Sequence, residues 1–184
     1  VSNVAKDCGI DRKTANNYFD LLEDLLIAYR LPAFQRRAKR KLTAHPKFFY
    51  FDVGLYRALR KRGPLDPIEE IEGPAIETLV AQEVRATNDY FELGYDVSFW
   101  RSASQHEVDF VLYGERGFIA IEVKRSSTFR RSDLESLQLF QSDYPEAEAF
   151  LVYLGDKSYL LDNIRVEPLA SFLKNLPEFI KGSG

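Results

Sequence analysis

The chain has 184 residues, 45% of them hydrophobic and 14% aromatic, so it can bury a core and hold one domain or two small ones. It has no apolar run of about 18 residues and no secretion signal, so we expect a soluble, cytoplasmic protein without a membrane partner. The single cysteine, Cys8, excludes an internal disulfide and a thiolate zinc site, and we expect a small buried thiol. Because the sequence contains no methionine, we expect it to be a piece of a longer protein.

The net charge of -3 conceals an asymmetry along the chain. Residues 1–62 hold 14 Lys or Arg against 6 Asp or Glu, whereas the remainder holds 11 against 22. The stretch "GPLDPIEEIEGP", rich in proline and glycine, separates the two parts and is typical of a linker. We therefore predict two modules, residues 1–62 and 74–180, joined by a linker over residues 63–73.

The basic half begins with a helix-turn-helix pattern. Residues 4–8 predict a short helix that ends at Gly9, and Asp11 is placed to cap a second helix. Helical spacing along that second helix is followed by Ala15, Tyr18, Phe19, Leu22, Leu25 and Leu26. The start of such a helix presents donors to a DNA groove, which makes Arg12, Lys13, Thr14 and Asn17 candidates for nucleic-acid contact.

The following stretch, "YRLPAFQRRAKRKLTAHPKFFYFD", predicts two strands around a basic turn, as in a winged helix. From Arg30 to Lys47 the chain has seven basic residues and no acidic one. Phosphate contacts are therefore expected from Arg36, Arg37, Lys39, Arg40 and Lys41. A protein-protein adaptor with a solvated hairpin tip is the alternative, and His45 is expected to be a loop residue.

The acidic half predicts an α/β sandwich with a mixed sheet. A helix from Pro74 has an apolar face with Glu77 close to it. Three strands follow in "DVSFWR", "EVDFVLYG" and "GFIAIEVK", and a capping box at Ser132 and Glu135 opens a helix over residues 132–141. The strand "EAFLVYLG", the extended "SYLLDNIRVEP" and the amphipathic helix "LASFLKNL" complete the order.

Charged residues stand at fixed positions on two of these apolar strands. Alternation places Glu122 and Lys124 on one face of their strand, opposite Ile121 and Val123. Asp109, on the preceding strand, is expected beside Glu122 across the hairpin. Two adjacent carboxylates repel unless a cation or a proton lies between them, and oxygen ligands of this kind suit Mg²⁺ or Mn²⁺.

The order of Glu77 on a helix, Asp109 on a strand and Glu122-Val123-Lys124 on the next strand resembles the signature of the PD-(D/E)XK nuclease superfamily. This superfamily includes restriction endonucleases and archaeal Holliday-junction resolvases. The phrases "KFFYFDVGLYRAL", "GPAIETLVAQEV", "WRSASQHEVDFVL" and "IAIEVKRS" look more closely like the C-terminal region of a group of prokaryotic AAA-type ATPases. There a P-loop domain precedes a winged helix and a nuclease-like domain, and the resemblance covers nearly the whole chain.

The resemblance implies a role for each matching residue. Asp109, Glu122 and the Val123 carbonyl would bind the metal, and Lys124 would orient or deprotonate water and stabilise charge on the phosphate. Glu77 would support the metal through water or as an outer ligand. Arg101, Arg125, Arg130 and Arg131 flank the site and could hold a DNA backbone. Glu107 is expected on the opposite strand face from Asp109, in a surface ion pair, with His106 at the start of the strand.

These residues predict a DNA-binding, magnesium-dependent nuclease module that has the ATPase domain as its partner in cis. The sequence lacks G-x-x-x-x-G-K-[ST], so we expect no ATP hydrolysis from this chain and no nucleotide cofactor. Two alternatives stay open: an interaction module in which the carboxylates and Lys124 form an ion-pair network, and a transcriptional regulator using the basic half alone. DNA or RNA as substrate and a homodimer as the assembly are also left open.

Overall fold

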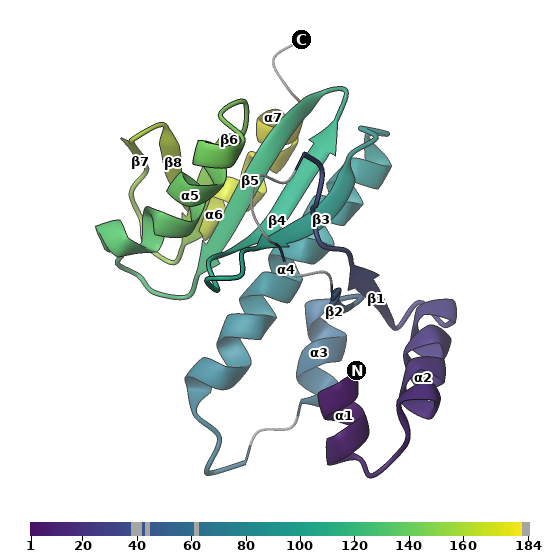
Figure 1. Cartoon of the computed structure of the whole chain (residues 1–184). Coiled ribbons are helices and arrows are strands. Elements are labelled where there is room, and N and C mark those ends of the chain that lie inside the picture. Colours follow the sequence, from purple (N-terminus) through teal and green to yellow (C-terminus); the bar gives the residue numbers. More distant parts are fainter. Residues whose placement is uncertain (38–41, 43–44, 61–62, 182–184) are drawn as a thin grey trace.

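A computed structural model describes residues 1–37, 42, 45–60 and 63–181, and Figure 1 shows its arrangement. The N-terminal half contains α1 (Ser2–Asp7), α2 (Arg12–Asp24), β1 (Ala28–Leu31), β2 (Lys47–Tyr50) and α3 (Val53–Leu59). The long helix α4 (Ile68–Tyr90) leads into β3 (Asp96–Arg101), β4 (Glu107–Gly114) and β5 (Gly117–Lys124). The rest contains a 3-10 turn (Arg131–Leu134), α5 (Glu135–Asp143), β6 (Glu148–Tyr153), β7 (Tyr159–Leu161), β8 (Ile164–Pro168), α6 (Leu169–Lys174) and α7 (Leu176–Ile180).

The described part of the chain forms a six-stranded sheet in the order β3-β4-β5-β6-β8-β7. Strands β3, β4 and β5 are antiparallel, β5 and β8 run parallel to β6, and β7 closes the sheet as an antiparallel edge strand. Gly114 pairs with Gly117, so a two-residue turn joins β4 to β5. The predicted α/β fold with a mixed sheet is confirmed.

Helices cover both faces of this sheet (Figure 1). Side chains of α4, α6 and α7, such as Val84, Phe172 and Ile180, pack with Ile121 on one face. Leu137 and Phe140 of α5 pack on the other face, in the cluster that contains Ala120. Strand β5 is therefore buried on both sides, so a charged residue on it needs a partner.

The helix signals in the N-terminal half are confirmed in part. Asp11 caps α2 as predicted, since one carboxylate oxygen accepts hydrogen bonds from the backbone N–H of Lys13 (2.9 Å) and Thr14 (3.0 Å). Within α2 itself, only Ala15 is buried, and Tyr18 is 60% exposed. Cys8 is also exposed, at the C-terminal end of α1, so the expectation of a buried thiol is wrong.

Helix α4 begins at Ile68, so the second half of the predicted linker is helical, and Pro74 lies inside the helix rather than at its start. The helix tolerates Pro74 because burial of Ile71 and Ala75 on its apolar side outweighs the one backbone hydrogen bond that proline removes. The predicted capping box at Ser132 is also corrected. The Asp133 carboxylate accepts the Arg130 N–H (2.7 Å), and a 3-10 turn precedes α5.

The two halves share their core, while most of the predicted basic hairpin tip, residues 38–41 and 43–44, lies outside the described residues. Strands β1 and β2 pair as predicted, but the chain after β1 runs alongside the edge strand β3. The Phe34 N–H donates to the Phe99 carbonyl (2.6 Å), and the Phe99 N–H donates to the Pro32 carbonyl (3.0 Å). Phe34 then packs in the α5-side cluster, while Leu31 and Phe49 pack on the α4 side. The segment thus covers the edge of β3.

Candidate active site at the open end of strands β4 and β5

Asp109 lies where strands β4 and β5 separate. The last residues of the two strands that pair regularly are Phe110 and Ile121, and beyond them the Asp109 carboxylate accepts the Val123 N–H at 2.9 Å. On the other side of β4, Asp109 and Phe110 together lie opposite Phe99, which is a β-bulge. Bulges of this kind redirect side chains and are frequent beside active sites. The Asp109 carboxylate therefore takes the place of a backbone carbonyl as the hydrogen-bond acceptor for the Val123 N–H.

Glu122 lies on β5 directly across from Asp109, as predicted. Its side chain is buried, with one carboxylate oxygen, Oε1, 2.8 Å from Lys124 Nζ. The second oxygen, Oε2, is buried and has no hydrogen-bond partner among the described residues. Burial, followed by the neighbouring charge of Asp109, raises the pKa of Glu122 well above its usual range. Lys124 therefore compensates the charge of the Glu122 carboxylate at Oε1 and not at Oε2.

Lys124 lies between the buried strand and solvent, with 35% of its side chain exposed. Burial alone would lower the pKa of Lys124, but Glu122 and Asp109 attract the ammonium and raise it above the usual value. Asp133, in the turn before α5, adds to the same effect. Lys124 therefore stays protonated at neutral pH.

A second lysine, Lys47 at the start of β2, enters the site from the N-terminal half. Its ammonium forms ion pairs with Glu107 and with Asp109, the latter at 3.2 Å, and only 17% of its side chain is exposed. It also lies 5.4 Å from the centre of the Phe99 ring. Burial lowers the pKa of Lys47, but Asp109 and Glu107 raise it overall, so the ammonium is kept.

Glu107 differs from the sequence expectation. It does form an ion pair, with Arg101, but it also shares Lys47 with Asp109, so the two carboxylates lie on the same side of β4. The expectation of opposite faces is wrong because residues two apart on a strand point the same way. Its neighbour His106 is half-buried, and the backbone carbonyl of His106 accepts the Ser102 N–H (2.9 Å).

Glu77 reaches the same site from helix α4. Burial, then the charges of Asp109 and Glu107, raises the pKa of Glu77 from 4.5 to about 7, against the opposing effect of Lys47. Glu77 and Lys47 also line a cavity of about 220 Å³ together with Tyr50 and Tyr56. The structure thus brings Glu77, Asp109, Glu122 and Lys124 together, as the sequence predicted.

The predicted nucleic-acid contacts near the site have varied surroundings. Arg130 and Arg131 are exposed at the start of the 3-10 turn. Arg101 is bound to Glu107, and Arg125 is half-buried and has interactions of its own. Of these four arginines, Arg130 and Arg131 are the most exposed.

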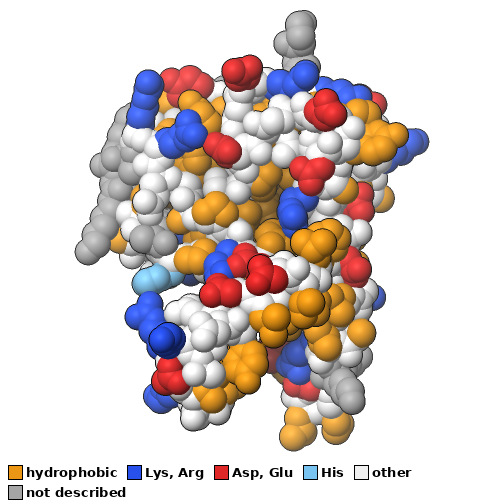
Figure 2. Space-filling view, turned by 90° about the vertical axis from the view of Figure 1, so that its right-hand side faces the viewer, with side chains coloured by type: hydrophobic (Ala, Val, Ile, Leu, Met, Phe, Trp, Pro, Cys, Tyr) orange, Lys and Arg blue, Asp and Glu red, His pale blue; other side chains and the backbone are white. Residues whose placement is uncertain are grey.

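In the N-terminal half, Arg12, Lys13 and Asn17 are exposed on α2, whereas the hydroxyl of Thr14 lies 2.5 Å from the Asp11 carboxylate as part of the helix cap. Figure 2 shows one face of the molecule, on which basic and acidic side chains of the described residues are interspersed. Lys39, Arg40 and Lys41 lie outside the described residues. On the face shown, the described basic residues of this half do not form one uniform basic surface.

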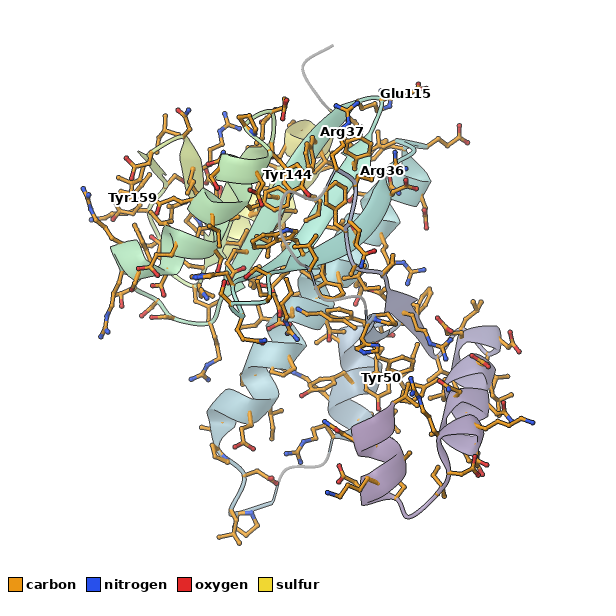
Figure 3. The ribbon with its side chains drawn as sticks, viewed as in Figure 1. Arg36, Arg37, Tyr50, Glu115, Tyr144 and Tyr159 are labelled. Carbon is orange, nitrogen blue, oxygen red and sulfur yellow. The ribbon has the colours of Figure 1, made fainter. Side chains whose placement is uncertain are left out.

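Arg36 and Arg37 lie far from the carboxylates. Arg36 pairs with Asp96 at 2.9 Å and lies 4.7 Å from the centre of the Tyr113 ring. Tyr113 is four residues along β4 from Asp109, which is roughly 13 Å at the usual rise per residue. Figure 3 shows Arg36 and Arg37 near the tip of the β4-β5 hairpin, where they line a cavity of about 910 Å³. These two arginines do not belong to the carboxylate site.

Sequence reasoning missed Lys47 and the inward direction of Glu107. A signal for Lys47 was present, because a lysine at the start of the apolar strand "KFFY" resembles Lys124 at the end of another. Strand pairing alone gave no indication that β2 would lie beside β4. Only the tertiary packing of β2 against the large sheet brings Lys47 to Asp109.

The donors present suit a magnesium ion in part. Among the described residues, no group of three or more His, Cys, Asp or Glu side chains is arranged to hold a metal. Mg²⁺ usually keeps several waters and binds through one or two carboxylates, so Asp109 and Glu122 meet its minimum requirement. The unpartnered Oε2 of buried Glu122 is the kind of atom that a cation would satisfy.

Two family models match the chain. A family model described as "Domain of unknown function (DUF4143)" matches residues 72–172, more than half of the chain, so the chain belongs to this family. This domain is common in AAA-ATPase-associated proteins. A second model, "Domain of unknown function (DUF8612)", matches residues 1–66. No curated protein matches the chain. None of the described helices combines the length and apolar character needed to cross a membrane.

Proposed function

We propose that this chain binds DNA and hydrolyses its phosphodiester bonds with Mg²⁺ or Mn²⁺, as the C-terminal region of an AAA-type ATPase. The observation that carries the proposal is the pair of Asp109 and Glu122 at the open end of β4 and β5, with Lys124 Nζ 2.8 Å from Glu122. The order α4, β3, β4, β5, α5, β6 agrees with the resemblance to PD-(D/E)XK nucleases. The order α1, α2, β1, β2 agrees with a winged helix-turn-helix.

The carboxylates and Lys124 have separate roles in this proposal. Asp109, Glu122 and the Val123 carbonyl would hold the metal, which when bound supplies positive charge that activates water and neutralises the phosphate. Lys124 is charged and partly exposed, and it would stabilise negative charge as it develops on the phosphate. Its raised pKa keeps Lys124 protonated at neutral pH, and an ammonium has no lone pair with which to accept a proton. Electrostatic stabilisation is therefore favoured over a role as general base.

Glu77 is the best candidate for proton transfer in the site. With a pKa of about 7 it is close to half protonated at neutral pH, which is where a general acid or base works best. Its position beside Lys47 and the small cavity would let it hold a water molecule next to the metal ligands. This supports the outer-ligand role that the resemblance implies.

DNA would be held by exposed donors on both halves. Arg12, Lys13 and Asn17 at the start of α2 are exposed, as groove-facing residues must be. Arg130 and Arg131 are exposed at the 3-10 turn before α5. Arg36 is engaged with Asp96 at the far end of the sheet and would contribute less.

Lys47 favours a second candidate function, a non-catalytic interaction module. Its ammonium neutralises Asp109 and Glu107 without a metal, as in a structural ion-pair network. In that case the same fold would recognise DNA or a partner for the ATPase, and Asp109 and Glu122 would contribute only to stability.

A cleavage assay on supercoiled, single-stranded and branched DNA with Mg²⁺ or Mn²⁺ separates the two candidates. We expect Glu122→Gln and Lys124→Ala each to reduce cutting about 100-fold or more while DNA binding is kept. The exposed Lys157→Ala is the matched control and should cut at the wild-type rate. If the wild type binds DNA but cuts none of these substrates, the interaction module is favoured instead.

A further inference from the structure

The most unexpected feature of the molecule is a lysine from one half bound to the carboxylates of the other. Lys47 is on β2, which pairs with β1 and follows the basic stretch, whereas Asp109 and Glu107 are on β4. Its ammonium lies 3.2 Å from Asp109 Oδ1, and its side chain is four-fifths buried. The other oxygen, Asp109 Oδ2, already accepts the Val123 N–H.

Both oxygens of Asp109 are therefore engaged before any metal arrives. A divalent cation on Asp109 Oδ1 would stand within a few ångströms of the Lys47 ammonium, and like charges at that distance repel strongly where water is excluded. Glu107 gives the ammonium a second anchor on the same strand, so Lys47 can leave Asp109 without losing its other partner.

We propose that Lys47 is an internal counter-ion that competes with the divalent cation for Asp109 and so sets the metal affinity of the site. The inference rests on the proposed function, since it takes Asp109 as a metal ligand. It makes Lys47 a positioning residue rather than a catalytic one. It also makes the site a property of both halves of the chain.

The competition has a measurable consequence for metal binding. Without the ammonium, Glu77, Glu107, Asp109 and Glu122 would lose a shared positive charge and would attract a cation more strongly. We expect Lys47→Met to bind Mn²⁺ roughly tenfold more tightly than the wild type, because a unit charge next to the ligand is removed. Lys47→Arg keeps the charge and should bind Mn²⁺ no more tightly than the wild type.

The test is titration of the full chain with Mn²⁺, followed by calorimetry and by the paramagnetic resonance signal of free Mn²⁺. Lys174→Met, an exposed lysine on α6, is the matched control and should leave the affinity unchanged. If Lys47→Met does not fold, Lys47→Gln keeps a hydrogen-bond donor to Asp109 without the charge. The rise in Tm on adding Mn²⁺ then reports the same affinity.

The outcomes separate the inference from the function on which it rests. Mn²⁺ binding that is tighter in Lys47→Met and Lys47→Gln but not in Lys47→Arg supports the counter-ion role. Binding that is equal or weaker in the uncharged variants overturns that role and leaves the proposed metal site intact. Absence of Mn²⁺ binding in the wild type and in all variants overturns the metal site itself, and the counter-ion role with it.

Discussion

The two halves of the molecule differ in how their hydrophobic residues are used. In the C-terminal half, strands β4, β5 and β6 are buried on both faces, and helices supply a close-packed layer on each side. In the N-terminal half, α2 buries only Ala15. The largest buried side chains of this half, Leu31, Phe34 and Phe49, pack into the core of the other half. A short segment with its own secondary structure thus depends on a neighbour for its core.

The same comparison explains where the charges lie. Charged groups on the well-packed half must be paired. Asp109 pairs with a lysine on the N-terminal strand β2, Glu107 with an arginine on β3, and Glu122 with a lysine on β5. Lys47, from the basic half, thus pairs with carboxylates of the acidic half in one buried network.

The strongest way to break the contact between the halves is Phe34→Ala. Phe34 is 6% exposed, and its ring centre lies 5.3 Å from that of Phe118 and 5.4 Å from that of Tyr144. We expect a loss of about 3 to 5 kcal/mol in the free energy of unfolding, measured by urea denaturation. Leu65→Ala, at a side chain 94% exposed, is the control. A loss below about 1 kcal/mol would mean that the halves are independent.

A pH series on Glu77→Gln tests the electrostatic side of the contact. The folded pKa of Glu77, about 7, lies above its ordinary value of 4.5, so folding favours the protonated form. Its contribution to stability is present in full below pH 4.5 and is lost as pH rises through about 7. At pH 8 we expect Glu77→Gln to be more stable than the wild type by about 1 to 3 kcal/mol in urea unfolding.

The slope of wild-type stability between these pH values should flatten in the Gln variant. Glu178→Gln, which removes one exposed carboxylate on α7, is the control and should keep the wild-type slope. An unchanged slope in Glu77→Gln would show that Glu77 titrates normally and is not in the buried network.

A smaller effect is expected inside the N-terminal half from Asp11→Ala. The variant removes the acceptor for the N–H groups of Lys13 and Thr14 and should destabilise the start of α2. Because α2 buries so little, we expect the loss to appear as faster amide hydrogen exchange in the first turn of α2. Asp11→Ser keeps a capping oxygen and should restore protection. Equal exchange in all three proteins would rule out the cap.

The smallest effect is expected for Arg36→Ala, at the opposite end of the sheet from Lys47. The Arg36 and Asp96 side chains are 60% and 74% exposed, so their ion pair should contribute less than about 1 kcal/mol. Urea unfolding of Arg36→Ala and of Asp96→Asn measures it. A cost above about 2 kcal/mol would show that the segment after β1 is held by charge rather than by Phe34.

Local signals in the sequence predicted much of the fold correctly. Alternation placed Glu122 and Lys124 on one face of β5, and the two-residue turn at Glu115-Arg116 set the register that brings Glu122 opposite Asp109. The start of α4 was wrong, because Pro74 resembles a first-turn proline while the buried contacts of Ile71 extend the helix backwards. The burial of several side chains thus decided where this helix begins, and the helix-start preference of one proline did not.

The sequence by itself predicted strands β1 to β6 and the alternating faces of β5, because periodicity and turns act over a few residues. It also named Glu77, Asp109, Glu122 and Lys124 as candidates for one site. Only the tertiary structure decided that Lys47 reaches Asp109, that Glu107 turns inward and that Phe34 joins the core of the other half. These contacts join residues more than 50 positions apart, and they form because β3 has an open edge and its sheet has apolar surface to cover. A pattern over a few residues does not indicate which distant segment of the chain will cover a strand edge or an apolar surface.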